Sequence, residues 1–190
     1  MLDLCLVVVG ADKHECKSFD LKYVECELHL VINNGLGTAA IANRFLNRSS
    51  KTVFGLAHPD VRFGINATSA FYSSALSGNV CGVVGRTTGL RYRWCCWNPG
   101  LVYALDDCCV FFRKDSGLTF DDVTFDKWSA HVPDLCFQAH AKGILVIVPK
   151  ANANHTGRRY FLGYRRHIRD WETQVQKLRD KWPDTQVVTT

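Results

Sequence analysis

The chain has 190 residues, of which 47% are hydrophobic and 22% are charged, and its net charge at pH 7 is +5. This composition is ordinary for a globular protein, so it excludes a chain that is disordered throughout. The length suits one domain, and we expect residues 1–190 to form a single globular domain in which 150–190 are a basic loop and a terminal helix. No apolar run near the start is long enough to cross a membrane, so no membrane span is expected.

The amino-terminal part predicts two strands and two short helices. The apolar run 4–9 indicates a buried strand, and the alternation of apolar and polar residues over 24–32 indicates a strand with one wet face. Thr38 can cap a short helix that extends to residue 46, and a second short helix is expected over 67–76, before Gly78.

The central and carboxyl-terminal parts predict more strands and a longer helix. Short apolar runs within 80–113, separated by glycine, asparagine and aspartate turn residues, favour an antiparallel meander. A short helix is expected over 121–128 and a buried strand over 143–148. Apolar residues spaced three and four apart over 168–182 predict an amphipathic helix that Pro183 ends. The expected fold class is therefore α+β, a mostly antiparallel sheet with three or four short helices and this terminal helix packed on it.

The net charge lies entirely in the last quarter of the chain. Residues 150–190 hold nine basic and four acidic residues, whereas the rest of the chain holds 14 of each. Basic and aromatic residues alternate over 150–169, and such mixtures suit phosphates and stacked bases. We therefore predict that this segment binds RNA or an acidic host protein surface; the alternative is a docked helix with a solvated basic face. The candidate binding residues are Lys150, Arg158, Arg159, Tyr160, Tyr164, Arg165, Arg166 and Arg169.

The nine cysteines favour free thiols rather than disulfides. Their number is odd, and without a secretory segment near the start we expect a reducing compartment, the cytoplasm. Zinc is an alternative, because two cysteine doublets occur close together; however, adjacent strand residues point to opposite faces and no C-x2-C spacing exists. We predict no cofactor, with zinc left as an alternative. The residues that a zinc site could draw on are Cys81, Cys95, Cys96, Cys108, Cys109, Cys136, His131 and His140.

Enzyme motifs are sparse. The chain lacks a G-x-S-x-G elbow, a phosphate-binding loop with its lysine, and a complete dinucleotide fingerprint. Glu27 and His29 repeat the spacing of the His-hydrophobe-His metal motif of rolling-circle nucleases, with glutamate in the first position. A hydrolase or nuclease built from Glu27, His29 and Tyr160, with Tyr164 as a second candidate nucleophile, is therefore the enzyme alternative. The favoured interpretation is the polar face of a half-buried strand, and no catalytic residue is predicted.

Two short stretches resemble viral protein families. The run 148–151 (VPKA), followed by 155–157 (HTG), resembles a segment of coronavirus nonstructural protein two, and Cys81 with Cys95 is similar to its zinc-bearing region without keeping the ligand spacing. The run 100–106 (GLVYALD) resembles a motif of the US22 proteins of large DNA viruses. Both resemblances imply a non-enzymatic viral accessory or nonstructural protein that binds a host protein or RNA in the host cytoplasm. A zinc-stabilised interaction module is a further alternative.

Overall fold

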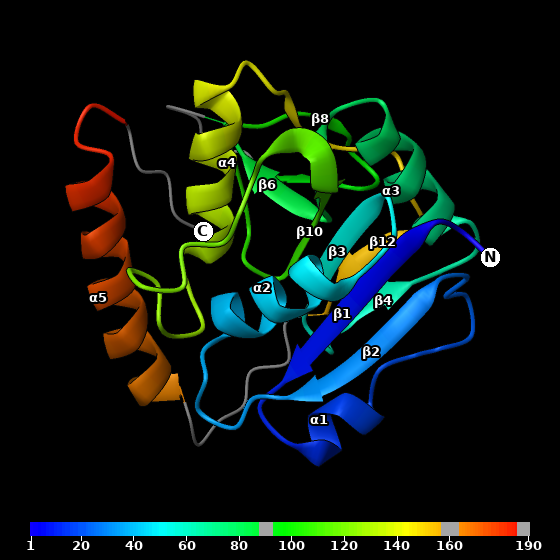
Figure 1. Ribbon diagram of the computed structural model, residues 1–190, viewed down its shortest axis with the longest axis horizontal. Coiled ribbons are helices and arrows are strands. Elements are labelled where there is room, and N and C mark those ends of the chain that lie inside the picture. The colour runs from blue at the N-terminus through cyan, green and yellow to red at the C-terminus, as the bar shows by residue number, and fades with distance from the viewer. Residues whose placement is uncertain (88–92, 157–163, 186–190) are drawn as a thin grey trace.

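The computed structural model describes residues 1–87, 93–156 and 164–185, and it places a seven-stranded sheet at the centre of the molecule (Figure 1). The helices are α1 (Lys13–Lys17), α2 (Thr38–Arg48), α3 (Ala67–Leu76), the 3-10 turn η1 (Lys114–Ser116), α4 (His131–Ala141) and α5 (Tyr164–Lys181). The strands are β1 (Leu4–Gly10), β2 (Glu27–Ile32), β3 (Val53–Ala57), β4 (Val61–Phe63), β5 (Val80–Cys81), β6 (Val84–Arg86), β7 (Arg93–Cys95), β8 (Gly100–Leu101), β9 (Ala104–Leu105), β10 (Cys109–Arg113), β11 (Val146–Val148) and β12 (Ala153–His155).

The central sheet is mixed rather than mostly antiparallel. Its order is β2-β1-β3-β10-β5-β11-β8, and β1, β2, β3, β5 and β11 run in one direction while β10 and β8 run in the other. The expected mixture of helices and strands is confirmed, but antiparallel pairing is confirmed only in part. The predicted meander contributes the separate antiparallel sheet β7-β6-β9, while the runs 4–9 and 53–57 are parallel strands buried along their whole length, a position that favours continuous apolar sequence.

Local sequence predicted three of the helices. Residues 38–46 and 67–76 form α2 and α3, and the terminal amphipathic pattern forms α5. The helix expected over 121–128 is wrong: that segment forms turns, and α4 begins at His131 instead. The short helix α1 was not predicted, although Asp12 caps it by accepting a hydrogen bond from the Glu15 N–H at 2.8 Å. Among the described residues, no helix has both the length and the apolar character needed to cross a membrane.

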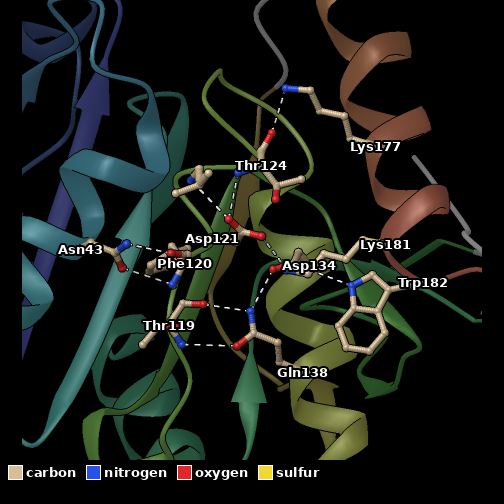
Figure 2. A network of polar contacts seen from close by, with 11 residues as sticks. Asn43, Thr119, Phe120, Asp121, Thr124, Asp134, Gln138, Lys177, Lys181 and Trp182 are labelled. Carbon is tan, nitrogen blue, oxygen red and sulfur yellow. Dashed lines mark hydrogen bonds and ion pairs between the residues drawn. The ribbon is translucent and has the colours of Figure 1, made fainter.

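Helix α5 docks against α4 and the segment 119–126 (Figures 1 and 2). Val175 and Leu178 are buried, as the apolar stripe predicted. Two lysines of its last turns contact carboxylates of the main body: Lys177 lies 2.9 Å from Asp126, and Lys181 lies 2.8 Å from Asp121 and from Asp134. These two lysines therefore anchor the helix instead of forming a free basic face.

The carboxyl ends of the parallel strands share one edge of the sheet with the start of β10. In the register, Cys109 at the start of β10 faces Ala57 at the end of β3. The chain leaves β1 toward β2 on one side and returns to β3 on the other, so the strand order reverses between β1 and β3. Ligands of open α/β sheets bind beyond the carboxyl ends of strands at such a point. This edge is therefore where a functional site is expected.

Candidate metal centre

Three side chains with metal-ligand atoms meet at this edge. The ligand atoms of Asp106, Cys108 and His155 all lie within 4.8 Å of one another. Asp106 and Cys108 belong to the turn between β9 and β10, and His155 ends β12. We call these three residues the edge cluster.

Backbone hydrogen bonds hold the edge cluster in place. The Asp106 N–H donates to the carbonyl oxygen of Val84 at 2.9 Å, and the carbonyl oxygen of Cys108 accepts from the His58 N–H at 2.8 Å. Strand β12 pairs with β4, so that His155 lies opposite Val61. The turn before β10 and the end of β12 are thereby brought together, although they are far apart in the sequence.

A carboxylate outside the edge cluster orients the histidine ring. His155 Nε2 lies 3.1 Å from Asp60 Oδ2, and its Nδ1 faces Asp106 Oδ2 at 4.0 Å. Burial raises the pKa of Asp60, but the hydrogen bond and charge of His155 outweigh this effect and the pKa lies below its ordinary value. An ionised Asp60 only accepts, so Nε2 is the nitrogen that donates to it. A cation bound at the edge cluster would require the neutral ring, with Nδ1 as the ligand atom. Histidines that bind metals are commonly oriented by a carboxylate in this way.

The edge cluster fits a divalent cation in spacing and chemistry. Two ligands bound to one ion at about 2.0–2.3 Å are separated by roughly 3–4 Å, which is close to the separation of Nδ1 and Asp106 Oδ2. A nitrogen, an oxygen and a sulfur donor together suit borderline ions such as Zn²⁺. Burial, together with the charges of Asp106 and Cys109, raises the pKa of the Cys108 thiol well above its ordinary value, so a cation bound here would have to displace that proton.

Asp107, the next residue, has a structural role. Its carboxylate accepts hydrogen bonds from the N–H groups of Ala130, at 2.8 Å, and Val132, at 3.0 Å, and so caps α4. Its side chain is only 16% exposed, and burial raises the pKa of Asp107 to about 7 against the effect of these bonds. His131 lies beside it, with Nδ1 3.4 Å from Asp107 Oδ1, and burial lowers the pKa of His131 to about 3. His131 is therefore neutral at physiological pH.

The raised pKa of Asp107 predicts a pH-dependent stability difference. The native protein holds a proton on Asp107 between about pH 4 and pH 7 that the unfolded chain has released, so this group's contribution to stability falls as pH rises through that window. Asp107→Asn cannot titrate. The unfolding free energy of the wild type minus that of the variant should therefore decrease across the window and level off above it. Urea unfolding at several pH values checks this, with Asp122→Asn as the control; a constant difference would contradict it.

Most of the predicted basic binding residues lie where the structure describes no side chains, so this prediction stays a prediction. Lys150 is exposed after β11, whereas Arg158, Arg159 and Tyr160 lie outside the described residues. The structure describes the backbone but not the side chains of residues 164–169 of α5, which include Tyr164, Arg165, Arg166 and Arg169.

Most of the predicted zinc residues that the structure describes lie outside any group of three possible ligands. Within residues 1–87, 93–156 and 164–185, Cys108 is the one member of that set in a group of three ligands, and its partners Asp106 and His155 were not predicted. His140 instead bonds the Tyr103 carbonyl oxygen at 2.7 Å, and the remaining cysteines that were candidates are not in ligand clusters. The sequence feature that could have pointed to this site is the Asp106-Asp107 pair, which directly follows an apolar run.

The Glu27–His29 pair of the enzyme alternative does converge. His29 Nε2 lies 2.8 Å from Glu27 Oε1 on β2, and both side chains are partly exposed. The candidate nucleophile Tyr160 lies outside the described residues. The predicted polar strand face is therefore present, but the three residues are not shown to form one site.

Comparisons with known proteins give similarity of fold only. No family model matches the sequence, and no curated protein sequence matches it. The structure of A197 from STIV is similar with a TM-score of 0.50 and 12% identity, covering 82% of this chain and 85% of that one. A putative nucleotide-diphospho-sugar transferase from Desulfovibrio desulfuricans gives 0.45 and 13%, covering 95% of both chains. Residues 1–349 of TarS from S. aureus give 0.49 and 12%, covering 94% of this chain and 66% of that one.

These comparisons correct the predicted function. The chain was expected to be a non-enzymatic viral accessory protein that binds RNA or a host protein, but the one of these three neighbours that is named for an activity is a transferase. The three neighbours include neither coronavirus nonstructural protein two nor a US22 protein, so those family resemblances stay predictions. The pairing of Lys177 and Lys181 with carboxylates removes part of the free positive charge of residues 150–190, although neither lysine is one of the predicted binding residues.

Proposed function

We propose that this protein is a divalent-metal-dependent transferase whose donor substrate carries a diphosphate. The observation that supports it is the orientation of His155: Asp60 holds Nε2, Nδ1 lies 4.0 Å from Asp106 Oδ2, and Cys108 belongs to the same group of possible ligands. This arrangement lies at the carboxyl edge of a mixed α/β sheet, close to the point where the strand order reverses.

The charges of the site favour a cation-bridged anionic substrate. Asp60 and Asp106 would repel a diphosphate directly, so such a ligand binds beside them only when a cation lies between. A bound divalent cation would neutralise the charge that develops on the diphosphate as it leaves the transferred group. A nucleotide-diphosphate sugar is a donor of this class, and the Desulfovibrio protein is named for such a donor. For this chain, the proposal of such a donor is supported by the geometry of the edge cluster alone.

Each residue of the site has a defined part in this proposal. Asp106, Cys108 and His155 hold the cation, and Asp60 fixes the ring orientation and the tautomer of His155. Asp107 is not a ligand, because its oxygens are bound to the amino end of α4. By bonding α4, Asp107 fixes the position of the turn that contains Asp106 and Cys108.

The proposal predicts that diphosphate binding depends on the metal and on the edge cluster. UDP, GDP and CDP are titrated calorimetrically into the metal-free protein and into protein supplied with Mn²⁺ or Zn²⁺. At least one of them should bind only with metal, and Asp106→Asn and His155→Gln should abolish this binding. Asp60→Asn should weaken metal affinity by about 10–100-fold, as the loss of an orienting carboxylate does elsewhere.

The control is Asp122→Asn, which removes an exposed carboxylate that is not in the edge cluster. It should leave binding unchanged, and circular dichroism checks that every variant is folded. Diphosphate binding that is equally tight without metal, or wild-type metal affinity in Asp106→Asn, would contradict the proposal.

A further inference from the structure

The Glu27–His29 pair has a third neighbour that the proposed function does not use. Cys5 lies next to the pair, and the ligand atoms of the three residues are all within 4.8 Å of one another. We propose that Cys5, Glu27 and His29 form a second metal site, selective for thiophilic divalent cations such as Zn²⁺ over Mg²⁺. This strand site, as we call it, is independent of the edge cluster.

The strand register places the three side chains on one face. Strands β1 and β2 are parallel, with Cys5 opposite Glu27 and Val7 opposite His29. Register partners point to the same face of a sheet, as do residues two apart on one strand. Cys5, Glu27 and His29 therefore project together from the amino-terminal halves of β1 and β2, away from the carboxyl edge.

The strand site combines a buried donor with two accessible ones. Cys5 is fully buried, whereas the side chains of His29 and Glu27 are 35% and 37% exposed. An ion can therefore enter from solvent and keep water as its remaining ligand. The His29 ring packs against Phe45 of α2 with 4.7 Å between ring centroids, so its orientation is restricted before an ion binds.

The charges around the strand site balance a divalent cation. A Cys5 thiolate and a Glu27 carboxylate supply two negative charges when the ion is bound. Burial raises the pKa of Cys5, and Glu27 adds to this, while a hydrogen bond with Ser49 and the charges of Lys114 and Lys51 act in the opposite direction. The two lysines have other partners: Lys114 bonds the Ser49 carbonyl oxygen, and Lys51 lies 3.8 Å from Asp3.

The donor set specifies the kind of ion. Thiolate, imidazole and carboxylate are the three ligand types of zinc sites, and three protein ligands plus water complete a tetrahedral shell. Mg²⁺ requires six oxygen ligands in octahedral geometry, and a buried sulfur opposes that. An ordinary hydrogen bond between Glu27 and His29 would give the same 2.8 Å contact without an ion. Only the metal site requires the Cys5 sulfur, so replacing Cys5 distinguishes a metal site from an ordinary hydrogen bond between Glu27 and His29.

Counting bound zinc in the full-length protein tests the strand site. Protein purified with a phosphine reductant is loaded with Zn²⁺, dialysed and analysed by native mass spectrometry. The wild type should hold two ions, one at the strand site and one at the edge cluster. Cys5→Ser and His29→Gln should each hold one, as should Asp106→Asn, and the double variant His29→Gln/Asp106→Asn should hold none. Cys16→Ser, which changes a buried cysteine outside both sets, is the control and should hold two.

Cobalt gives a second readout that depends on the sulfur. In a Cys108→Ser background, Co²⁺ should still produce a thiolate-to-cobalt charge-transfer band, and adding Cys5→Ser should abolish it. Glu27→Gln, at a partly exposed position, should weaken Zn²⁺ binding by at least about tenfold without loss of the fold. If His29→Gln and Cys5→Ser keep the wild-type zinc count, or if the Cys108→Ser background gives no band, the strand site is refuted. One ion that is lost in Asp106→Asn but kept in His29→Gln would refute it while leaving the edge cluster intact; the opposite pattern would refute the edge cluster alone.

Discussion

Replacing Lys181 with methionine is expected to lower the free energy of unfolding by about 2–4 kcal/mol, because it leaves a buried carboxylate without its cation. The Asp134 side chain is 0% exposed and accepts hydrogen bonds from Lys181, Gln138 and the Trp182 indole N–H, each at 2.8 Å (Figure 2). Lys181 also bonds Asp121 at 2.8 Å. The Lys181 ammonium group therefore forms ion pairs with two carboxylates, those of Asp121 and Asp134, where α5 packs against α4.

Lys177→Met provides the matched comparison on the same helix. Its partner Asp126 is 49% exposed, so solvent can replace the lost contact and we expect a cost below about 1 kcal/mol. Urea unfolding of both variants at neutral pH measures the difference. Equal losses would mean that burial of Asp134 does not decide the strength of this contact.

The acid limb of the stability curve gives an additional check on Lys181. Burial raises the pKa of Asp121, but hydrogen bonds from Lys181 and Thr124 outweigh it and lower the pKa to about 2. The ionised group therefore stabilises the fold above about pH 4, and this contribution is lost as pH falls from about 4 to about 2. In Lys181→Met this loss should be smaller, because part of the contribution is already absent.

Gly37→Ala is expected to lower the free energy of unfolding by about 2–6 kcal/mol, the second large effect. Gly37 has φ 72° and ψ 150°, a backbone conformation that is essentially restricted to glycine and costs other residues about 1–3 kcal/mol. A β-carbon there would also overlap the carbonyl oxygen of Asp126 and lie 2.8 Å from its carbonyl carbon. Because both atoms are backbone, the crowding adds about 1–3 kcal/mol of strain.

Gly35→Ala separates the two causes of this loss. Gly35 also has a positive φ, 90°, but a β-carbon there meets nothing within 4 Å. Its cost should be about 1–2 kcal/mol, the backbone strain alone. Thermal and urea unfolding of the two variants, measured side by side, should show the larger loss of stability in Gly37→Ala, where the contact adds to the backbone strain. If both variants lose the same stability, the close approach of residues 37 and 126 is not tight in solution.

Gly37→Ala should also change the structure near the edge cluster. The Thr38 N–H donates to the Lys127 carbonyl oxygen at 3.2 Å, and Trp128 in the same segment packs against His58 with 5.9 Å between ring centroids. Displacing residues 126–128 would move this tryptophan relative to the histidine that follows β3. A change in tryptophan fluorescence in Gly37→Ala, absent in Gly35→Ala, would show it.

Features set by neighbouring residues could be predicted, and those set by distant ones could not. The periodic apolar stripes of α2 and α5 and the alternation of β2 are local, and they were recognised from the sequence. Strand direction was not, because a continuous apolar run such as 4–9 does not reveal which strands will pair with it. Helix α4 was missed for a similar reason: its cap is Asp107, which precedes it by more than 20 residues, a distance at which no capping pattern is visible.

The two ligand sets show the same division. Glu27 and His29 share a strand, so their convergence could be predicted, whereas Cys5 joins them only through the β1–β2 register. Asp106 and His155 meet because β12 pairs with β4 and β10 pairs with β3. These pairings decide the edge cluster, and neither is encoded in a short motif.

The consecutive carboxylates Asp106 and Asp107 have different partners. Asp106 belongs to the edge cluster, whereas Asp107 accepts hydrogen bonds from the N–H groups at the start of α4. A single planar peptide unit lies between the Cα atoms of the two residues and fixes the separation of those atoms. Asp134 of α4 in turn forms an ion pair with Lys181 of the carboxyl-terminal helix α5. We therefore expect ion binding at the edge cluster to change the position of α5, because Asp107, α4 and Asp134 connect the two places.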